Sequence, residues 1–392
     1  MTTGMPGSAL ASITGMGSIT ALGEGTDPLW QAALDGTFSL QDGFGPIPEE
    51  IRSSGLTAPD FSTLIHRLQE SPALSLSLRA GWQAFQQAGW TSLNPDDGLI
   101  IGTTTGQANY WEASLMAFLR DPSNSEEGVN RYGGTPLGML TSDLQEILKH
   151  HGPAQTIASA CCASTQAIAV ASHWISSGKV KRCLVGGVEL LCELTRTGFQ
   201  SLQIASKERC RPFDKDRSGI NLSEAVVFLC LEKAGAENRL AQVSGFGIAG
   251  DASHMTAPHP EGDGCRRAMQ GALSMAKLAP SDIDWIHAHG TGSRHNDLAE
   301  SKAIQAVFPA PPPVSSTKGV HGHALGASGA LESVLVVRAL REGRLLPNWG
   351  LENQDPEITI NIVREPGHSS ARHVMKNTLA FGGVNTSLIF SV

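Results

Sequence analysis

Positive charge is absent from the first part of the sequence. No lysine or arginine precedes Arg52, so the amino-terminal segment lacks the basic start of a secretory signal peptide. No apolar run approaches the roughly 20 residues that a helix needs to cross a bilayer. We therefore expect a cytoplasmic protein with no membrane span.

Basic residues are also a minority over the whole chain. The 29 lysines and arginines are outnumbered by 37 aspartates and glutamates, which gives a formal net charge of −8. Nucleic acids bind to extended positive surfaces, so we expect no nucleic-acid partner. A local basic patch can still bind an acidic protein.

Cysteine pairs at metal-site spacing are missing. The seven cysteines, at positions 161, 162, 183, 192, 210, 230 and 265, are odd in number and form no C-x-x-C pair. This excludes a disulfide framework and a structural zinc site as the organising feature. A phosphate-binding G-x-x-x-x-G-K-S/T loop is missing as well.

Two further patterns are incomplete. Residues 245–250 match G-x-G-x-x-G by letter, but Pro258 and Pro260 follow where a dinucleotide site needs a helix terminus. The pairs at 287/289 and 321/323 supply four histidines, yet no acidic or thiolate ligand accompanies them at metal-site spacing in the sequence. We expect neither a nucleotide nor a metal site.

The sequence does contain an alternation of short apolar segments and helix-like stretches. The 392 residues include 43 glycines, and the segments at 98–102, 182–187 and 226–232 read as buried strands. Helices are predicted over 165–177 and 327–342, because a glycine suited to a left-handed cap follows each one. The pattern predicts an α/β protein with a boundary near 231–240.

The first segment with chemical meaning is Ser159-Ala-Cys161-Cys-Ala-Ser164. Small side chains here leave room for a substrate, and the segment stands at the start of a predicted helix. A helix amino terminus favours negative charge, so we expect it to stabilise a cysteine thiolate. The adjacent cysteines leave the nucleophile ambiguous at this point.

Three more segments of the sequence belong with the one at 159–164. They are His287-Ala-His289-Gly-Thr-Gly-Ser293, Val314-Ser-Ser-Thr-Lys318-Gly-Val-His-Gly-His323, and Leu379-Ala-Phe381-Gly-Gly-Val-Asn385. In this order the four segments resemble the signatures of β-ketoacyl synthases. With Thr14-Gly-Met-Gly17 and Arg211-Pro-Phe-Asp214, the resemblance covers nearly the whole chain.

The resemblance implies the thiolase-like fold, in which two similar α/β halves stack in five α-β-α-β-α layers. Residues 1–238 would form the half that carries the nucleophile, and residues 239–392 the half that carries both catalytic histidines. The active site would lie between the halves. Members of the family usually assemble as dimers.

The resemblance also assigns the nucleophile. The catalytic cysteine of the family stands seventeen positions before a helix-ending glycine, and Gly178 stands seventeen positions after Cys161. Cys161 is therefore expected to hold an acyl group, and Cys162 to be a packing residue. His289 and His323 would stabilise the enolate formed when a malonyl thioester on acyl carrier protein loses carbon dioxide.

The remaining site residues follow from the same resemblance. Lys318 would pair with Glu332, the backbone N–H groups of Cys161 and Phe381 would form an oxyanion hole, and Phe381 would act as a gate. Residues expected to contact substrate are Thr291 and Ser293 along the phosphopantetheine arm and Thr105 near the acyl tail. The chain itself would bind no cofactor, because the phosphopantetheine belongs to the acyl carrier protein.

Several alternatives stay open. A thiolase or a chain-initiating synthase shares the fold but uses a different residue set, and a chain-length factor lacks the nucleophile. The partner could be an identical chain or a chain-length factor. The sequence departs from the family at Ser223-Glu-Ala-Val226, where G-E-G-A is usual, and at Ala380, where glycine is usual. Fatty acid elongation is possible, and we favour polyketide or polyene elongation.

Overall fold

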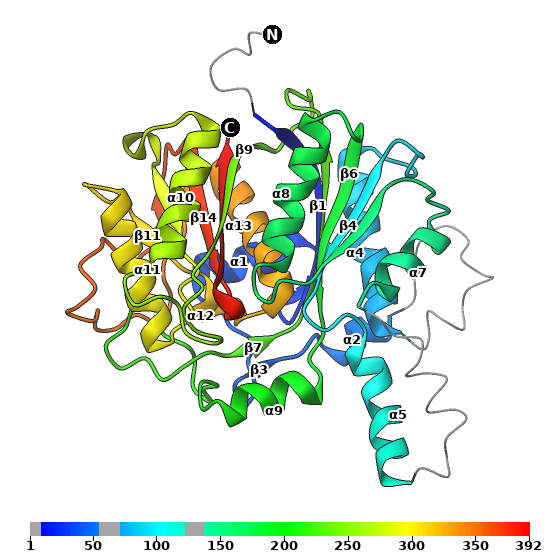
Figure 1. Cartoon of the computed structure of the whole chain (residues 1–392), viewed down its shortest axis with the longest axis horizontal. Helices are drawn as coiled ribbons and strands as arrows, with labels where there is room; N and C mark the ends of the chain where they lie inside the picture. The colour runs from blue at the N-terminus through cyan, green and yellow to red at the C-terminus, as the bar shows by residue number, and fades with distance from the viewer. Residues whose placement is uncertain (1–8, 55–70, 122–136) are drawn as a thin grey trace.

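The computed structural model describes residues 9–54, 71–121 and 137–392, and a large mixed sheet runs through it (Figure 1). The strand order is β11-β10-β14-β15-β9-β1-β8-β6-β4-β5, with β2 paired to β1. The strands are β1 (Ala11–Thr20), β2 (Gly23–Glu24), β4 (Gly98–Gly102), β5 (Ala154–Ile157), β6 (Arg182–Glu189), β8 (Ala225–Glu232), β9 (Ala241–Gly250), β10 (Trp285–His287), β11 (Val314–Ser315), β14 (His373–Leu379) and β15 (Val384–Ser391).

The sheet consists of two halves with the same topology. One half has the order β1-β8-β6-β4-β5 and the other has the order β9-β15-β14-β10-β11. They join through a short antiparallel pairing that runs from Ala11 opposite Val243 to Ile13 opposite Ala241. The turn between β8 and β9 contains residues 238 and 239, which we propose as the boundary between the halves.

Helices cover both outer faces of the sheet and fill the space between its halves (Figure 1). The central layer is formed by α8 (Ala163–Ser176) and α13 (Ser328–Glu342), which pack on each other and on strands of both halves. The outer layers are α4 (Pro72–Ala88) with α7 (Met139–Ile147), and α10 (Asp263–Ala276) with α11 (Arg294–Val307). The predicted five-layered α/β fold is confirmed.

The two predicted helices lie within two residues of their expected bounds. Gly178 and Gly343, which follow α8 and α13, have φ of 76° and 60°, a conformation that glycine adopts without strain. Residues 334–337 of α13 are fully buried, as their uniformly apolar character predicted. The middle of α13 is therefore enclosed on every side.

The glycine-rich segments of β1 and β9 serve close packing between helix and sheet. A Cβ atom on Gly17 would lie 2.0 Å from the carbonyl oxygen of Ala80 in α4, and one on Gly247 would lie 2.0 Å from that of Ala268 in α10. Residues 245–250 therefore belong to strand β9, whose Gly245 and Gly247 are buried against α10, and form no phosphate loop.

The remaining elements are short or lie at the periphery. They are α1 (Thr26–Asp35), α2 (Glu49–Arg52), α5 (Ala108–Arg120), α9 (Glu193–Ser201), α12 (Lys318–His321), the 3-10 helices η3 (Pro280–Asp282), η4 (Leu325–Ala327) and η5 (Phe381–Gly383), and the strand pairs β3 (Phe44–Gly45) with β7 (Leu222–Ser223) and β12 (Arg344–Leu345) with β13 (Gly367–His368). Among the described residues, no helix has the length and apolar character needed to cross a membrane.

Candidate active site

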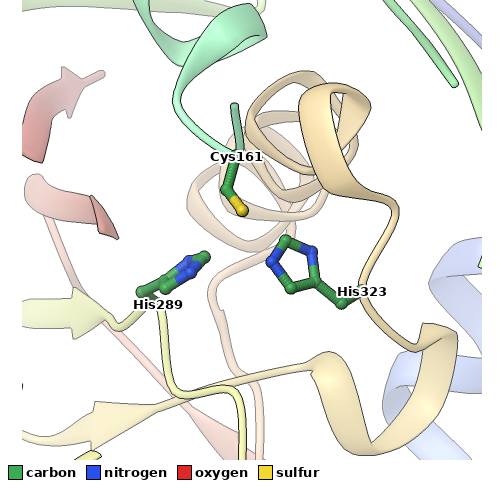
Figure 2. Close-up of side chains that lie close together, drawn as sticks. All are labelled: Cys161, His289 and His323. Atoms are coloured by element: carbon green, nitrogen blue, oxygen red, sulfur yellow. The ribbon is translucent and has the colours of Figure 1, made fainter. Parts of the chain in front are cut away.

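Cys161, His289 and His323 meet between the two halves. The cysteine sulfur and a nitrogen of each ring lie within 4.8 Å of one another, and the two rings are T-shaped with centroids 5.2 Å apart. Figure 2 shows both imidazoles pointing toward the sulfur. The three side chains come from the turn before α8, the loop after β10 and the segment after α12, so distant parts of the chain build the site.

A strained turn presents Cys161 to this space. Ala160 has φ of 48°, a left-handed conformation that is costly for a residue with a side chain. Cys162 faces the other way, because its sulfur lies 3.3 Å from the carbonyl oxygen of Thr378 and 3.4 Å from that of Val384. Only Cys161 of the two is directed toward the histidines.

The thiol form of Cys161 is favoured in this closed site. Burial raises its pKa to about 11, while the charge of Lys318 and a backbone hydrogen bond from Phe381 act in the opposite direction. The stabilisation of a thiolate by the helix terminus stays a prediction, and burial of the sulfur acts against it.

Hydrogen bonds define the tautomer of both histidines. Nδ1 of His289 lies 3.2 Å from Nζ of Lys318, and an ammonium group can only donate. Nδ1 of His323 accepts from the backbone N–H of Leu325 at 3.1 Å and lies 2.8 Å from the hydroxyl of Ser328. Burial, followed by the charge of Lys318, lowers the pKa of both rings well below the ordinary value. Each ring is therefore neutral, with its proton on Nε2.

This tautomer suits hydrogen-bond donation better than metal binding. A metal held by Nε2 of either ring would require the ring proton on Nδ1, where Lys318 and Leu325 already donate. The other two histidines do not join the cluster, since His287 and His321 bind the hydroxyl of Thr317 at 3.0 and 2.8 Å. Two Nε2–H groups thus face the sulfur of Cys161.

A buried charge cluster supports His289 from behind. Nζ of Lys318 donates to the carbonyl oxygen of His289 at 2.6 Å and to the carboxylate of Glu332, and both charged side chains are fully buried. Burial acts to raise the pKa of Glu332, but the charges of Lys318 and Lys376 hold it well below its ordinary value. The predicted pair of Lys318 and Glu332 is present.

Lys376 is a member of this cluster that the sequence analysis missed. Its Nζ lies 3.0 Å from the second carboxylate oxygen of Glu332. The signal was a lysine inside the otherwise uncharged stretch Val374 to Leu379 of β14, next to the recognised gate segment. A charged residue in the interior of a buried strand needs a buried partner.

The cleft above the cysteine contains the predicted residues Thr291 and Ser293, whose hydroxyl oxygens are 3.0 Å apart. Phe381 also lines it, and its ring stacks on that of Phe199 from α9. Further lining residues that the sequence did not single out are Thr256, His295, Asn296 and Asn385.

Thr105 lies outside the cleft around Cys161. Its hydroxyl donates to the carboxylate of Glu189 at 2.6 Å, and it is not among the residues that line the cleft around Cys161. The same carboxylate accepts backbone N–H groups from Thr104 and Gly326 at 2.8 and 3.0 Å. Thr105 is thus tied into a buried polar network.

Known proteins share both the sequence and the fold. Residues 11–236 match the N-terminal domain and residues 240–352 the C-terminal domain of beta-ketoacyl synthases. The 3-oxoacyl-(acyl-carrier-protein) synthase 2 of Mycobacterium leprae is 32% identical, over 96% of this chain and 95% of that protein.

Solved ketosynthases superpose over almost the full length. The ishigamide ketosynthase/chain length factor has a TM-score of 0.88 at 27% identity and covers 97% of this chain and 98% of its own. A chain of the complex between the ketosynthase ApeO and its chain length factor ApeC from Xenorhabdus doucetiae has a TM-score of 0.84 at 30% identity, with 98% of each chain covered. The fold is thiolase-like. The chain belongs to the β-ketoacyl synthase family.

Proposed function

We propose that this chain is a β-ketoacyl-(acyl carrier protein) synthase that condenses malonyl-carrier protein with an acyl group held on Cys161. The observation that carries the proposal is the pair of Nε2–H groups, from His289 and His323, that face the sulfur of a buried cysteine. Such donors stabilise an oxyanion and leave the cysteine available as the nucleophile.

In the first half-reaction, the sulfur of Cys161 attacks the carbonyl of an acyl thioester on the carrier protein. A thioester to Cys161 forms, the bond to the phosphopantetheine sulfur breaks, and that sulfur leaves as a thiol with the proton of Cys161. Backbone N–H groups of Cys161 and Phe381, which also approach the cysteine sulfur, would hold the oxyanion of the tetrahedral intermediate.

In the second half-reaction, a malonyl thioester takes the place of the departed carrier. Breaking its bond to the carboxylate releases carbon dioxide and leaves an enolate, whose oxygen accepts hydrogen bonds from Nε2 of His289 and His323. The enolate carbon attacks the acyl carbonyl on Cys161. The product is a 3-oxoacyl thioester two carbons longer, and the cysteine sulfur is released and reprotonated.

The unusual segment at 223–226 touches this machinery. The backbone N–H of Ser223 donates to the carbonyl oxygen of His323 at 3.0 Å, and the N–H of His323 donates to Asn221 at 2.7 Å. The family's flexible glycines are replaced here by Ser223 and Ala225. Reduced backbone freedom next to His323 supports a specialised substrate, and we infer a polyketide or polyene chain in preference to an ordinary fatty acyl chain.

The same proposal extends to substrates, partners and location. The substrates would arrive on the phosphopantetheine arm of an acyl carrier protein, past Thr291 and Ser293 in the cleft. The working assembly would be a dimer in the cytoplasm, with either an identical chain or a chain-length factor as partner. A thiolase activity fits less well, because the site presents two histidines backed by Lys318.

The test is product formation by the purified chain. It is incubated with malonyl-carrier protein and a panel of acyl-carrier proteins of graded length and unsaturation, and the carrier-bound products are weighed by mass spectrometry. The proposal predicts 3-oxoacyl products two carbons longer than the primer. Light scattering of the chain alone distinguishes self-association from the need for a different partner, and absence of product with every primer, with or without such a partner, would contradict the proposal.

A further inference from the structure

Lys376 is buried within reach of three oxygen atoms. Its Nζ lies 3.0 Å from the carboxylate of Glu332 and 3.2 Å from the hydroxyl of Thr165, and it also donates to the hydroxyl of Thr378. The two hydroxyl oxygens are 2.8 Å apart. All three partners can accept from an ammonium group, and the carboxylate of Glu332 opposes the burial that lowers the pKa of Lys376.

The position of Lys376 connects the elements that carry the site. Thr165 belongs to α8, four residues after Cys161, and Glu332 belongs to α13. Lys376 itself belongs to β14, which continues into the gate at Phe381. It lies behind the reacting groups and lines no part of the cleft around Cys161.

The charges of the buried cluster do not cancel. Lys318 and Glu332 form a neutral pair, and Lys376 adds a second cation to the same carboxylate. The cluster formed by these three residues therefore has a net charge of +1 when both lysines are protonated. A buried charge acts over a longer range than one in water, because little solvent screens it.

The titratable groups around this cluster come from several elements. The carboxyl of Glu300 accepts the backbone N–H groups of His289 and Gly290, and burial raises its pKa to about 7. The other groups that interact with the cluster are Cys161, Cys162, Cys210, His287, His289, His321 and His323. Lys376 acts to lower the pKa of each of the four histidines.

We propose that Lys376 is a positioning residue that supplies the excess positive charge of the site and shares Glu332, so that Lys318 stays directed at His289. This inference rests on the proposed condensation, because the charge matters when an enolate forms. With Lys376 present, Glu332 is held from both sides and both catalytic rings stay neutral. Developing negative charge between His289 and His323 is then stabilised by a net cation behind them.

Four variants separate charge from hydrogen bonding and packing, and one of them is the single change Glu332→Gln. Lys376→Gln keeps a donor toward Thr165 and Thr378 without the charge, and Lys376→Met removes both. Glu332→Gln combined with Lys376→Met removes one anion and one cation, so the net charge returns to that of the native cluster. Circular dichroism and the thermal midpoint show which variants fold.

The first measurement is carbon dioxide release from malonyl-carrier protein at pH 8, with each change made in a Cys161→Gln background. Lys376→Gln and Lys376→Met should each lower the rate about tenfold, less than the roughly 10²–10³ lost with a direct oxyanion-hole donor, because Lys376 acts from behind the histidines. The fold decrease in rate in the double variant should be smaller than the fold decreases of Lys376→Met and Glu332→Gln multiplied together, because the two charges are coupled. A native rate in Lys376→Gln, or a loss equal to the product, would overturn the inference.

The second measurement needs no catalysis. Histidine titrations followed by NMR should show the pKa of His289 and His323 higher in Lys376→Gln than in the native chain, because the charge of Lys376 acts to lower both. Unchanged titrations would refute the role of Lys376 even if every rate had fallen. If Cys161→Gln releases no carbon dioxide at all, the proposed function fails, while the titration still decides the role of the lysine.

Discussion

Phe381 stacks on Phe199, with ring centroids 5.5 Å apart and 13° between the ring planes. The two rings come from η5 and α9, so the expected gate is held closed against a helix of the other half. The gate loop is also anchored by the N–H of Gly382, which donates to the carbonyl oxygen of Met255 at 2.7 Å. Opening must break both contacts.

Ala380 is expected to tune this opening. In the closed gate it has φ of −131°, which any residue adopts, so its methyl group restricts only the other conformations of the loop. Ala380→Gly should change the rate of acyl loading about two- to fivefold, the value of the 0.5–1 kcal/mol that glycine adds in backbone freedom. The loading rate is measured by intact-mass time courses of the acyl-enzyme. If the native chain and Ala380→Gly load at the same rate and also condense at the same rate, Ala380 has no such role.

The reactivity of Cys161 should rise steeply with pH. With a pKa of about 11, the thiolate fraction grows about tenfold for each pH unit between 7 and 9, and alkylation by iodoacetamide should follow it. Cys161→Ala gives the background from the other cysteines, which are all buried. A rate that is already constant above pH 7 would indicate a stabilised thiolate instead.

Decarboxylation should depend much less on pH. The pKa values of His289 and His323 lie well below the ordinary 6.5, so both rings are neutral above that value and remain so as the pH falls to 6. Carbon dioxide release by Cys161→Gln should therefore stay level between pH 8 and pH 6. A fall with a midpoint near 6.5 would show that the rings titrate as exposed histidines do.

Thr105 is predicted to stabilise the folded protein through its hydrogen bond to Glu189. Thr105→Ile removes a hydroxyl that donates to a buried carboxylate, and a lost partner of this kind costs about 1–3 kcal/mol. Thr105→Ser keeps the hydroxyl and is the matched control. Urea unfolding measures the cost. Native stability in Thr105→Ile, together with selective loss of rigid or unsaturated acyl substrates, would instead support the expected contact with the acyl tail.

Sequence reasoning predicted the two central helices and the meeting of Cys161, His289 and His323, because these depend on local or linear signals. Gly178 and Gly343 end α8 and α13 since both residues adopt positive φ. The two similar halves were expected only from the family resemblance, because the equivalence of β1 and β9 depends on backbone pairing and leaves little trace in the sequence beyond their paired glycines. Between the two halves of the sheet, the strand order is better preserved than the side chains.

The residues that were missed depend on contacts between distant segments. Lys376 meets Glu332 and Thr165 only after three separate elements have packed together. Phe199 reaches Phe381 across the cleft, and no spacing in the sequence reports that distance. The tie between Thr105 and Glu189 was likewise invisible, since their separation in the chain is 84 residues.

Cys161 and the two histidines are proposed to act in different half-reactions. Acyl transfer would require the sulfur of Cys161, whereas decarboxylation would require chiefly the Nε2–H donors of His289 and His323. Cys162→Ala serves as the control for the nucleophile, because the sulfur of Cys162 faces the carbonyl oxygens of Thr378 and Val384.

The decisive measurement follows acyl-enzyme by intact mass and carbon dioxide release from malonyl-carrier protein in parallel. Cys161→Gln should release carbon dioxide without loading or elongating an acyl chain. His323→Ala should still load Cys161 but lose about 10²–10³ in decarboxylation, as when one donor of an oxyanion hole is removed, and Cys162→Ala should do both reactions. Chain elongation by Cys161→Gln, or loss of acyl loading in Cys162→Ala alone, would contradict the account and make Cys162 the nucleophile.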